Sequence, residues 1–156
     1  SCLQWKDDNV MALNNYAYYL SEKGVDLHKA ESMSYKTIKA EPNNGTYLDT
    51  YAWILFMEER YADAKTYIDQ ALKNRDSTAD NSTVLEHAGD IYYMNGMTDE
   101  SVDFWKKAYT GENQTEVLAW KIKNRQYITE EELKKRNAPK QKPAATKKSV
   151  RKGKKK

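Results

Sequence analysis

The sequence is poor in the residues that form disulfides, tight turns and membrane spans. Its 156 residues include one cysteine, Cys2, which excludes an intramolecular disulfide and any cysteine-based metal cluster within the chain. Three prolines and six glycines are too few for the many turns of an all-β protein. No apolar run approaches the roughly 18–20 residues that a membrane-spanning helix requires.

Histidine is also scarce, and this bears on catalysis. His28 and His87 lie far apart in the sequence, and neither belongs to a cluster of serine, histidine and aspartate residues. A nucleophile needs a base within hydrogen-bond reach, and a metal needs several ligands at fitting spacing. We therefore expect no catalytic residue, no metal site, no cofactor and no small-molecule substrate.

Acidic residues are absent from the last part of the chain. Residues 134–156 hold 12 basic and no acidic side chains, whereas residues 1–133 hold 14 basic and all 23 acidic ones. The formal net charge of +3 thus combines −9 for an acidic body with +12 for a basic tail. Any inference about partners has to treat the two parts separately.

Small residues recur along the body at a regular spacing. They fill three equivalent positions in each of three units: Ala17, Ala30 and Thr37; Ala52, Ala64 and Ala71; Gly89, Ser101 and Ala108. Thr37 and Ala71 are 34 residues apart, and Ala71 and Ala108 are 37 apart. Apolar residues around them recur every three or four positions, as in amphipathic helices. The pattern predicts three helix–turn–helix units whose small residues let the two helices approach closely.

The helical pattern also sets the expected domain boundaries. The predicted hairpins cover 10–22 with 27–41, 46–57 with 61–74, and 83–94 with 99–110. A further helix over 115–127 would cap the last hydrophobic face, so that 10–128 form the folded array.

The two ends of the chain differ from the array. Residues 1–9 are in phase with the end of a preceding repeat, and we expect the chain to be a C-terminal fragment of a longer protein. Thr129 followed by Glu132 is a capping-box pattern, which predicts a short helix or linker over 129–136. Residues 137–156 are rich in lysine and almost free of apolar residues, which predicts a disordered basic tail.

The repeat resembles the tetratricopeptide repeat family. The third unit is the most similar, with Leu85, Ala88-Gly89, Tyr92 and Trp105 at the family's positions. The resemblance covers about residues 1–128, and its style is that of bacterial members. It implies an all-α, right-handed superhelical solenoid whose first helices line a concave groove. It also implies a non-enzymatic scaffold that binds a peptide segment of a partner protein in that groove.

Carried over by motif position, ten residues of the first helices are expected to face this groove. They are Tyr18, Glu22, Asp49, Trp53, Phe56, Met57, Glu86, Asp90, Tyr93 and Met94. The helical phase agrees, because these residues lie off the stripe that packs each hairpin. Aromatic residues are enriched at binding sites, so Trp53 and Tyr93 are the expected anchors. The alternative is that these aromatics pack against the next unit.

The charges of the predicted groove residues narrow the class of peptide that we expect to bind. The predicted groove residues include acidic side chains but no lysine or arginine. Chaperone-binding members of the family clamp a C-terminal carboxylate with lysine, arginine and asparagine. The corresponding positions here hold Asn14, Tyr18, Thr50, Thr83 and His87, none with a firm positive charge. We therefore expect an apolar or basic peptide.

The basic tail has several interpretations. It could bind nucleic acid or an anionic membrane surface by neutralising phosphates, which is the main alternative function. It could also occupy the acidic groove, or act only as a flexible terminus. Residues 142–156 are similar to a bipartite nuclear-import signal, but in a bacterial protein this similarity would be accidental. We expect a bacterial cytoplasmic or periplasmic setting rather than a nuclear one.

Overall fold

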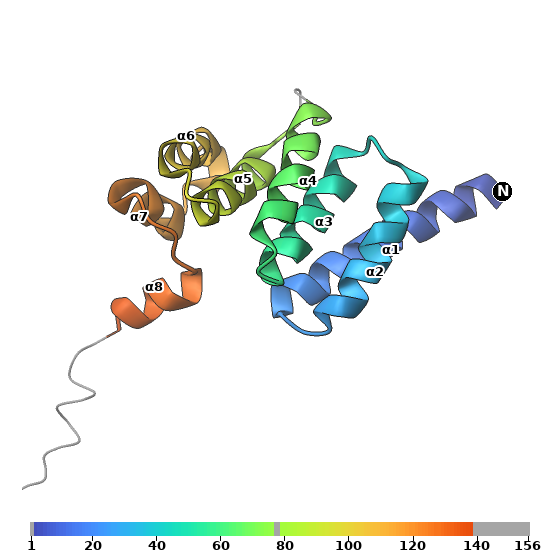
Figure 1. Cartoon of the computed structure of the whole chain (residues 1–156), viewed down its shortest axis with the longest axis horizontal. Helices are drawn as coiled ribbons and strands as arrows, with labels where there is room; N and C mark the ends of the chain where they lie inside the picture. Colours follow the sequence, from blue (N-terminus) through green and yellow to red (C-terminus); the bar gives the residue numbers. More distant parts are fainter. Residues whose placement is uncertain (1, 77–78, 139–156) are drawn as a thin grey trace, which may run out of the picture.

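The fold consists of antiparallel helix pairs that follow one another along the long axis of the molecule (Figure 1). The computed structural model describes the backbone of residues 2–76 and 79–138, and the side chains of 9–76 and 79–138. This part of the chain contains eight α-helices and one short 3-10 helix: α1 Cys2–Lys23, α2 Leu27–Ala40, α3 Gly45–Met57, α4 Tyr61–Lys73, α5 Ser82–Met94, α6 Thr98–Ala108, η1 Gly111–Asn113, α7 Glu116–Asn124 and α8 Glu130–Arg136.

The predicted helical hairpins agree with the observed ones. α1 pairs with α2, α3 with α4, and α5 with α6, and their bounds lie within a few residues of those predicted, apart from the start of α1. α1 runs without a break from Cys2 to Lys23, so the predicted end of a preceding repeat at 1–9 is not a separate element. No glycine or proline interrupts this stretch, so nothing in the sequence ends the helix there. In the part of the chain that the structure describes, no helix is long and apolar enough to cross a membrane.

The nine repeated small residues are all buried, as the spacing predicted. Thr37 and Ser101 stand where the repeat family usually has alanine, and both side chains are fully buried. Each hydroxyl donates to a carbonyl oxygen one turn earlier in its own helix, at 2.6 Å for Ser34 and 2.8 Å for Thr98. The helix itself therefore satisfies the extra polar group, and the helices pack as closely as they would around alanine.

The tightest helix crossing is in the third unit, where Gly89 faces Trp105. A β-carbon at residue 89 would lie 2.3 Å from Cδ1 of the Trp105 indole, which is fully buried. The equivalent pair in the second unit is Ala52 with Ile68, and both are also fully buried. The third unit thus accommodates the large Trp105 side chain on one helix because Gly89 on the other helix has no side chain.

The turns inside the three units share one backbone conformation. Gly24 and Gly96, which follow α1 and α5, have φ angles of +69° and +78°. In the second unit the same left-handed conformation falls on Glu59, with φ of +64°. A side chain at this position is strained relative to glycine.

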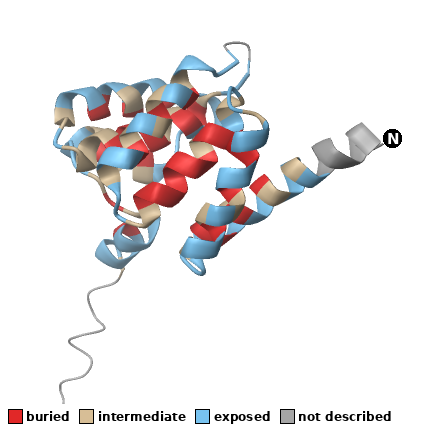
Figure 2. Ribbon diagram, turned by 45° about the vertical axis from the view of Figure 1, so that its right-hand side comes forward, coloured by how far each residue is buried: buried red, intermediate tan, exposed pale blue. Residues whose placement is uncertain are grey.

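The core runs along the middle of the array and is closed at the C-terminal end (Figure 2). α3 is the central helix, with nine of its 13 residues buried, because it packs against helices on both sides. α7 packs on α6 through Leu118, as expected of a capping helix. α7 ends at Asn124, earlier than predicted, because Arg125 adopts a left-handed conformation with φ of +54°. The chain then reverses, and Ile128 and Leu133 are buried.

Candidate functional site

Two hollows lie along the inner face, which we define as the face formed by the first helix of each unit, α1, α3 and α5. Each has a volume of about 600 Å³. The first, which we call the amide hollow, is lined by six asparagines among other residues: Asn14, Asn15, Asn43, Asn44, Asn74 and Asn81. Asn14 is buried, and its Oδ1 has no hydrogen-bond partner in the described part of the chain.

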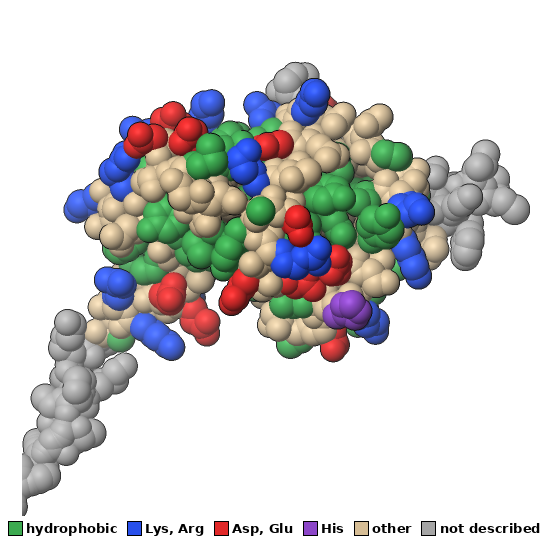
Figure 3. Space-filling model, viewed as in Figure 1, with side chains coloured by type: hydrophobic (Ala, Val, Ile, Leu, Met, Phe, Trp, Pro, Cys, Tyr) green, Lys and Arg blue, Asp and Glu red, His purple; other side chains and the backbone are tan. Residues whose placement is uncertain are grey.

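The second hollow, which we call the acidic hollow, lies between α1 and the C-terminal helices. Five carboxylates line it: Glu22, Glu86, Asp90, Glu130 and Glu131. The two hollows meet at Tyr18 and Thr83, which line both. In the space-filling view, acidic side chains lie on α8 and on the lower part of the body that faces it (Figure 3).

Aromatic rings form a continuous row across this face. Ring centroids are 6.2 Å apart for Tyr18 and His87, 4.0 Å for His87 and Trp53, and 4.6 Å for Trp53 and Phe56. The row ends at Tyr127, whose ring meets Phe56 edge-on at 5.6 Å. These rings join α1, α5 and α3 to the segment after α7, and give the inner face a rigid floor.

His87 is the polar centre of the row. Its ring is 6 % exposed, and Nδ1 lies 2.9 Å from Oδ1 of Asp49. Burial by itself lowers the pKa of His87, but the attraction of Asp49, Asp90 and Glu86 outweighs burial. The pKa of His87 therefore lies above its ordinary value, and Asp49 stabilises the protonated form of the ring.

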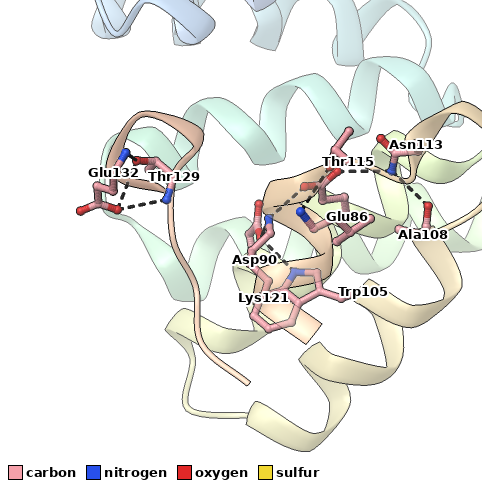
Figure 4. Close-up of polar contacts among 10 residues, drawn as sticks. Glu86, Asp90, Trp105, Ala108, Asn113, Thr115, Lys121, Thr129 and Glu132 are labelled. Carbon is pink, nitrogen blue, oxygen red and sulfur yellow. Dashed lines mark hydrogen bonds and ion pairs between the residues drawn. The ribbon is translucent and has the colours of Figure 1, made fainter. Parts of the chain in front are cut away.

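Lys121 of α7 enters the same face and is almost fully buried, with 2 % of its surface exposed (Figure 4). Its Nζ lies 2.7 Å from Asp90 and 2.9 Å from Glu86. Asp90 also accepts a hydrogen bond from Nε1 of Trp105 at 2.9 Å. Burial lowers the pKa of Lys121, but the attraction of the two carboxylates raises it by more than burial lowers it. The net pKa therefore lies above the ordinary value for lysine, and the ammonium stays charged. Lys121 is not among the residues that the sequence predicted for this face.

Six of the ten predicted groove residues line the acidic hollow: Tyr18, Glu22, Trp53, Met57, Glu86 and Asp90. Asp49 lines the amide hollow. Phe56, Tyr93 and Met94 line neither. Phe56 is 6 % exposed beneath Trp53, and Tyr93 packs against Trp105 with centroids 6.0 Å apart. Phe56 is also covered by Tyr127 from the segment after α7, and Tyr93 by Trp105 from the second helix of its own unit.

The expected anchor Trp53 is itself only 8 % exposed, because His87 and Phe56 both stack on its indole. Tyr18 is half-buried and offers more of its ring. Two contributors that sequence analysis missed are Lys121 and Tyr127. Lys121 follows Leu118 by three positions and so shares its buried face, which was the available signal.

One cluster of side chains consists of residue types that can bind a metal ion. His28, Glu31 and Glu58 each offer a ligand atom, and these atoms lie within 4.8 Å of one another. The sequence did not predict this cluster, because Glu58 comes from a different unit. The guanidinium of Arg60 donates to Glu31 at 3.0 Å and to Glu58 at 3.4 Å. An arginine is thus already paired with both glutamates, and we assign no metal site there.

Comparison with solved structures identifies the architecture. The chain superposes on the first tetratricopeptide domain of Spaghetti (RPAP3), bound to an HSP90 peptide, with a TM-score of 0.64 at 13% identity over 74% of this chain and 89% of that one. The fold is that of a tetratricopeptide-repeat protein. This tetratricopeptide array also matches the N-terminal domain of stress-induced protein-1 from C. elegans, with a TM-score of 0.58, 20% identity and coverage of 76% and 94%. A third match is the TPR2AB domain of yeast Sti1 in its HSP90 complex, with a TM-score of 0.56, 22% identity and coverage of 83% and 48%.

Sequence comparison gives a more distant relation. A TPR repeat-containing protein of Pseudomonas aeruginosa is 35% identical over 66 residues, which are 42% of this chain. The chain spans only 11% of the length of that relative. No family model matches the chain. The predicted nucleic-acid or membrane contact falls almost wholly on residues 139–156, which lie outside the described residues.

Proposed function

We propose that the chain is a non-enzymatic interaction module that binds a peptide segment of a partner protein along its inner face. The observation that carries this proposal is that the two hollows are adjacent and share Tyr18 and Thr83 in their lining. Each hollow has a volume of about 600 Å³, which is typical of ligand sites in proteins. An extended peptide advances about 3.3 Å per residue, so a short segment can occupy both hollows in succession.

The chemistry of the two hollows fits different parts of a peptide. Amide side chains both donate and accept hydrogen bonds, so the amide hollow matches the peptide backbone. The acidic hollow favours an apolar or basic side chain over an acidic one, because its five carboxylates repel negative charge.

The solved relatives support peptide binding but differ in charge preference. The Spaghetti domain is bound to the HSP90 peptide SRMEEVD, which contains two glutamates and one aspartate. In our proposal such a peptide binds this chain poorly, because Glu22, Glu130 and Glu131 are exposed at the acidic hollow. The arginine of that peptide lies next to a methionine, but three acidic residues follow it. A partner with lysine or arginine next to apolar residues, and without acidic residues beside them, fits better.

A substitution at the junction of the hollows tests the proposal. Thr83 is exposed and lines both hollows, so Thr83→Arg should block the groove without disturbing the core. Thr66→Arg places the same side chain at an exposed position of α4, away from the hollows. The probes are two fluorescein-labelled pools of short apolar peptides, one containing lysine and arginine and the other aspartate and glutamate.

Fluorescence anisotropy with the full chain should show preferential binding of the basic pool. Thr83→Arg should weaken this binding by about tenfold or more, whereas Thr66→Arg should leave it unchanged. Circular dichroism confirms that both variants remain folded. Equal binding by Thr83→Arg and Thr66→Arg would show that the inner face is not the binding site.

A further inference from the structure

We propose that the acidic hollow is a receptor for one cationic side chain, an arginine guanidinium or a lysine ammonium, of the bound segment. This inference rests on the proposed function and specifies which side chain the site selects. Its basis is an excess of carboxylates at the hollow. The lining contains five carboxylates but only two ammonium groups, those of Lys121 and Lys134.

The buried part of this charge is partly neutralised by one ammonium. Lys121 pairs with Asp90 at 2.7 Å and with Glu86 at 2.9 Å, and its side chain is 3 % exposed. The remaining three carboxylates, those of Glu22, Glu130 and Glu131, are exposed at the mouth of the hollow. The excess negative charge therefore lies where a ligand can reach it.

The exposed carboxylates are hardly paired with cations of the chain itself. In the part of the chain that the structure describes, neither Glu22 nor Glu131 forms an ion pair. Glu130 lies 3.8 Å from Lys134, but both side chains are about three-quarters exposed, so solvent screens this pair. A cation from a partner would thus add an interaction without displacing a strong internal one.

The carboxylates come from two walls. Glu22 lies near the end of α1, one helical turn after Tyr18. Glu131 lies in the first turn of α8, on the C-terminal side of the hollow. A guanidinium presents several donors in one plane, so it can pair with a carboxylate on either wall.

The ring of Tyr18 adds a surface for the cation. Eight lysine or arginine contacts with aromatic rings occur in the described residues, and none involves Tyr18 or Trp53. Tyr127, on the far side of the hollow, already has Lys121 Nζ at 5.5 Å from its ring centre. A partner cation beside Glu22 would contact the half-buried Tyr18 ring, which attracts positive charge through its π-electrons.

A pair of small probes tests the charge requirement independently of peptide binding. N-acetyl-arginine amide carries the guanidinium, and N-acetyl-citrulline amide is its nearly isosteric, uncharged counterpart. Each is titrated into the ¹⁵N-labelled full chain, and binding is measured from amide shifts around residues 22 and 131. The variant Glu22→Gln/Glu131→Gln removes both charges. Glu100→Gln is the matched control, since Glu100 is also an exposed carboxylate in the first turn of a helix.

The arginine probe should bind at least about tenfold more tightly than the citrulline probe. Glu22→Gln/Glu131→Gln should remove that preference, and Glu100→Gln should preserve it. Equal affinity for the two probes, no shifts at these residues, or a preference retained in the double variant would overturn the inference. If the arginine preference holds but Thr83→Arg does not affect peptide binding, the proposed function alone fails. If Thr83→Arg blocks peptides but the probes bind equally, this inference alone fails.

Discussion

Lys121 offers the sharpest test of how the C-terminal helix is held to the array. Lys121→Met keeps most of the volume of the side chain but removes the ammonium that lies between Asp90 and Glu86. Asp90 is 4 % exposed, so its carboxylate would remain buried with only the Trp105 N–H as a strong donor. Removing one partner of a buried ion pair costs about 3–5 kcal/mol.

Proton uptake limits this cost and gives it a pH signature. Burial already raises the pKa of Asp90, and Lys121 opposes that rise. Without Lys121, the folded-state pKa of Asp90 rises further above its unfolded value, so protonation favours the folded variant at low pH. The loss of stability should therefore be about 3 kcal/mol at pH 7 and smaller at pH 5. At roughly 3 °C per kcal/mol, Tm should fall by about 10 °C at pH 7.

Urea unfolding followed by circular dichroism at both pH values measures these differences. Lys123→Met, at an exposed position of the same helix, should change stability by less than about 0.5 kcal/mol. Adding Asp90→Asn to Lys121→Met should recover part of the loss, because the amide oxygen can still accept from Trp105 without a charge. A loss below about 1 kcal/mol for Lys121→Met, or an equal loss at pH 5 and pH 7, would refute the reasoning.

Three further predictions concern packing, backbone strain and pH. Gly89→Ala places a methyl group 2.3 Å from the Trp105 ring and should destabilise the fold by at least about 2 kcal/mol in urea unfolding; an unchanged midpoint would contradict the close crossing. Glu59→Gly relieves a left-handed side-chain position and should raise stability by about 0.5–1 kcal/mol, so a lower Tm would argue against strain there. His87 has a raised folded-state pKa, so its pairing with Asp49 contributes stability that is complete below the unfolded pKa and lost as pH rises through the folded one. His87→Phe should flatten the stability profile over that window, and an unchanged profile would show that another group titrates.

The fold was predictable from the sequence because short-range periodicity determines helices and their pairing. Ala52, Gly89 and Ala108 mark helix crossings by size alone, and their spacing gave the units without any knowledge of tertiary contacts. The start of α1 was less predictable, because continued helical phase does not show where one helix ends and the next begins.

The site was only partly predictable because its decisive contacts are long-range. The pairing of Lys121 with Glu86 and Asp90 spans 35 and 31 residues. The helical phase predicted Tyr18 and Glu22 on the inner face, where both line the acidic hollow. It could not show that α7 brings a cation to that face. It also could not show that Trp53 would be stacked upon by His87 from the next unit.

The contact between Phe56 and Tyr127 changes the connectivity of the array. In a linear repeat protein each unit touches only its neighbours, so terminal units can fray independently. Here the segment after α7 reaches past the third unit to the second, which closes a loop of about 70 residues in the contact map. The C-terminal helices and the central unit should therefore melt in a single cooperative transition. Folding should include a late step in which this loop closes, slower than the formation of the local hairpins.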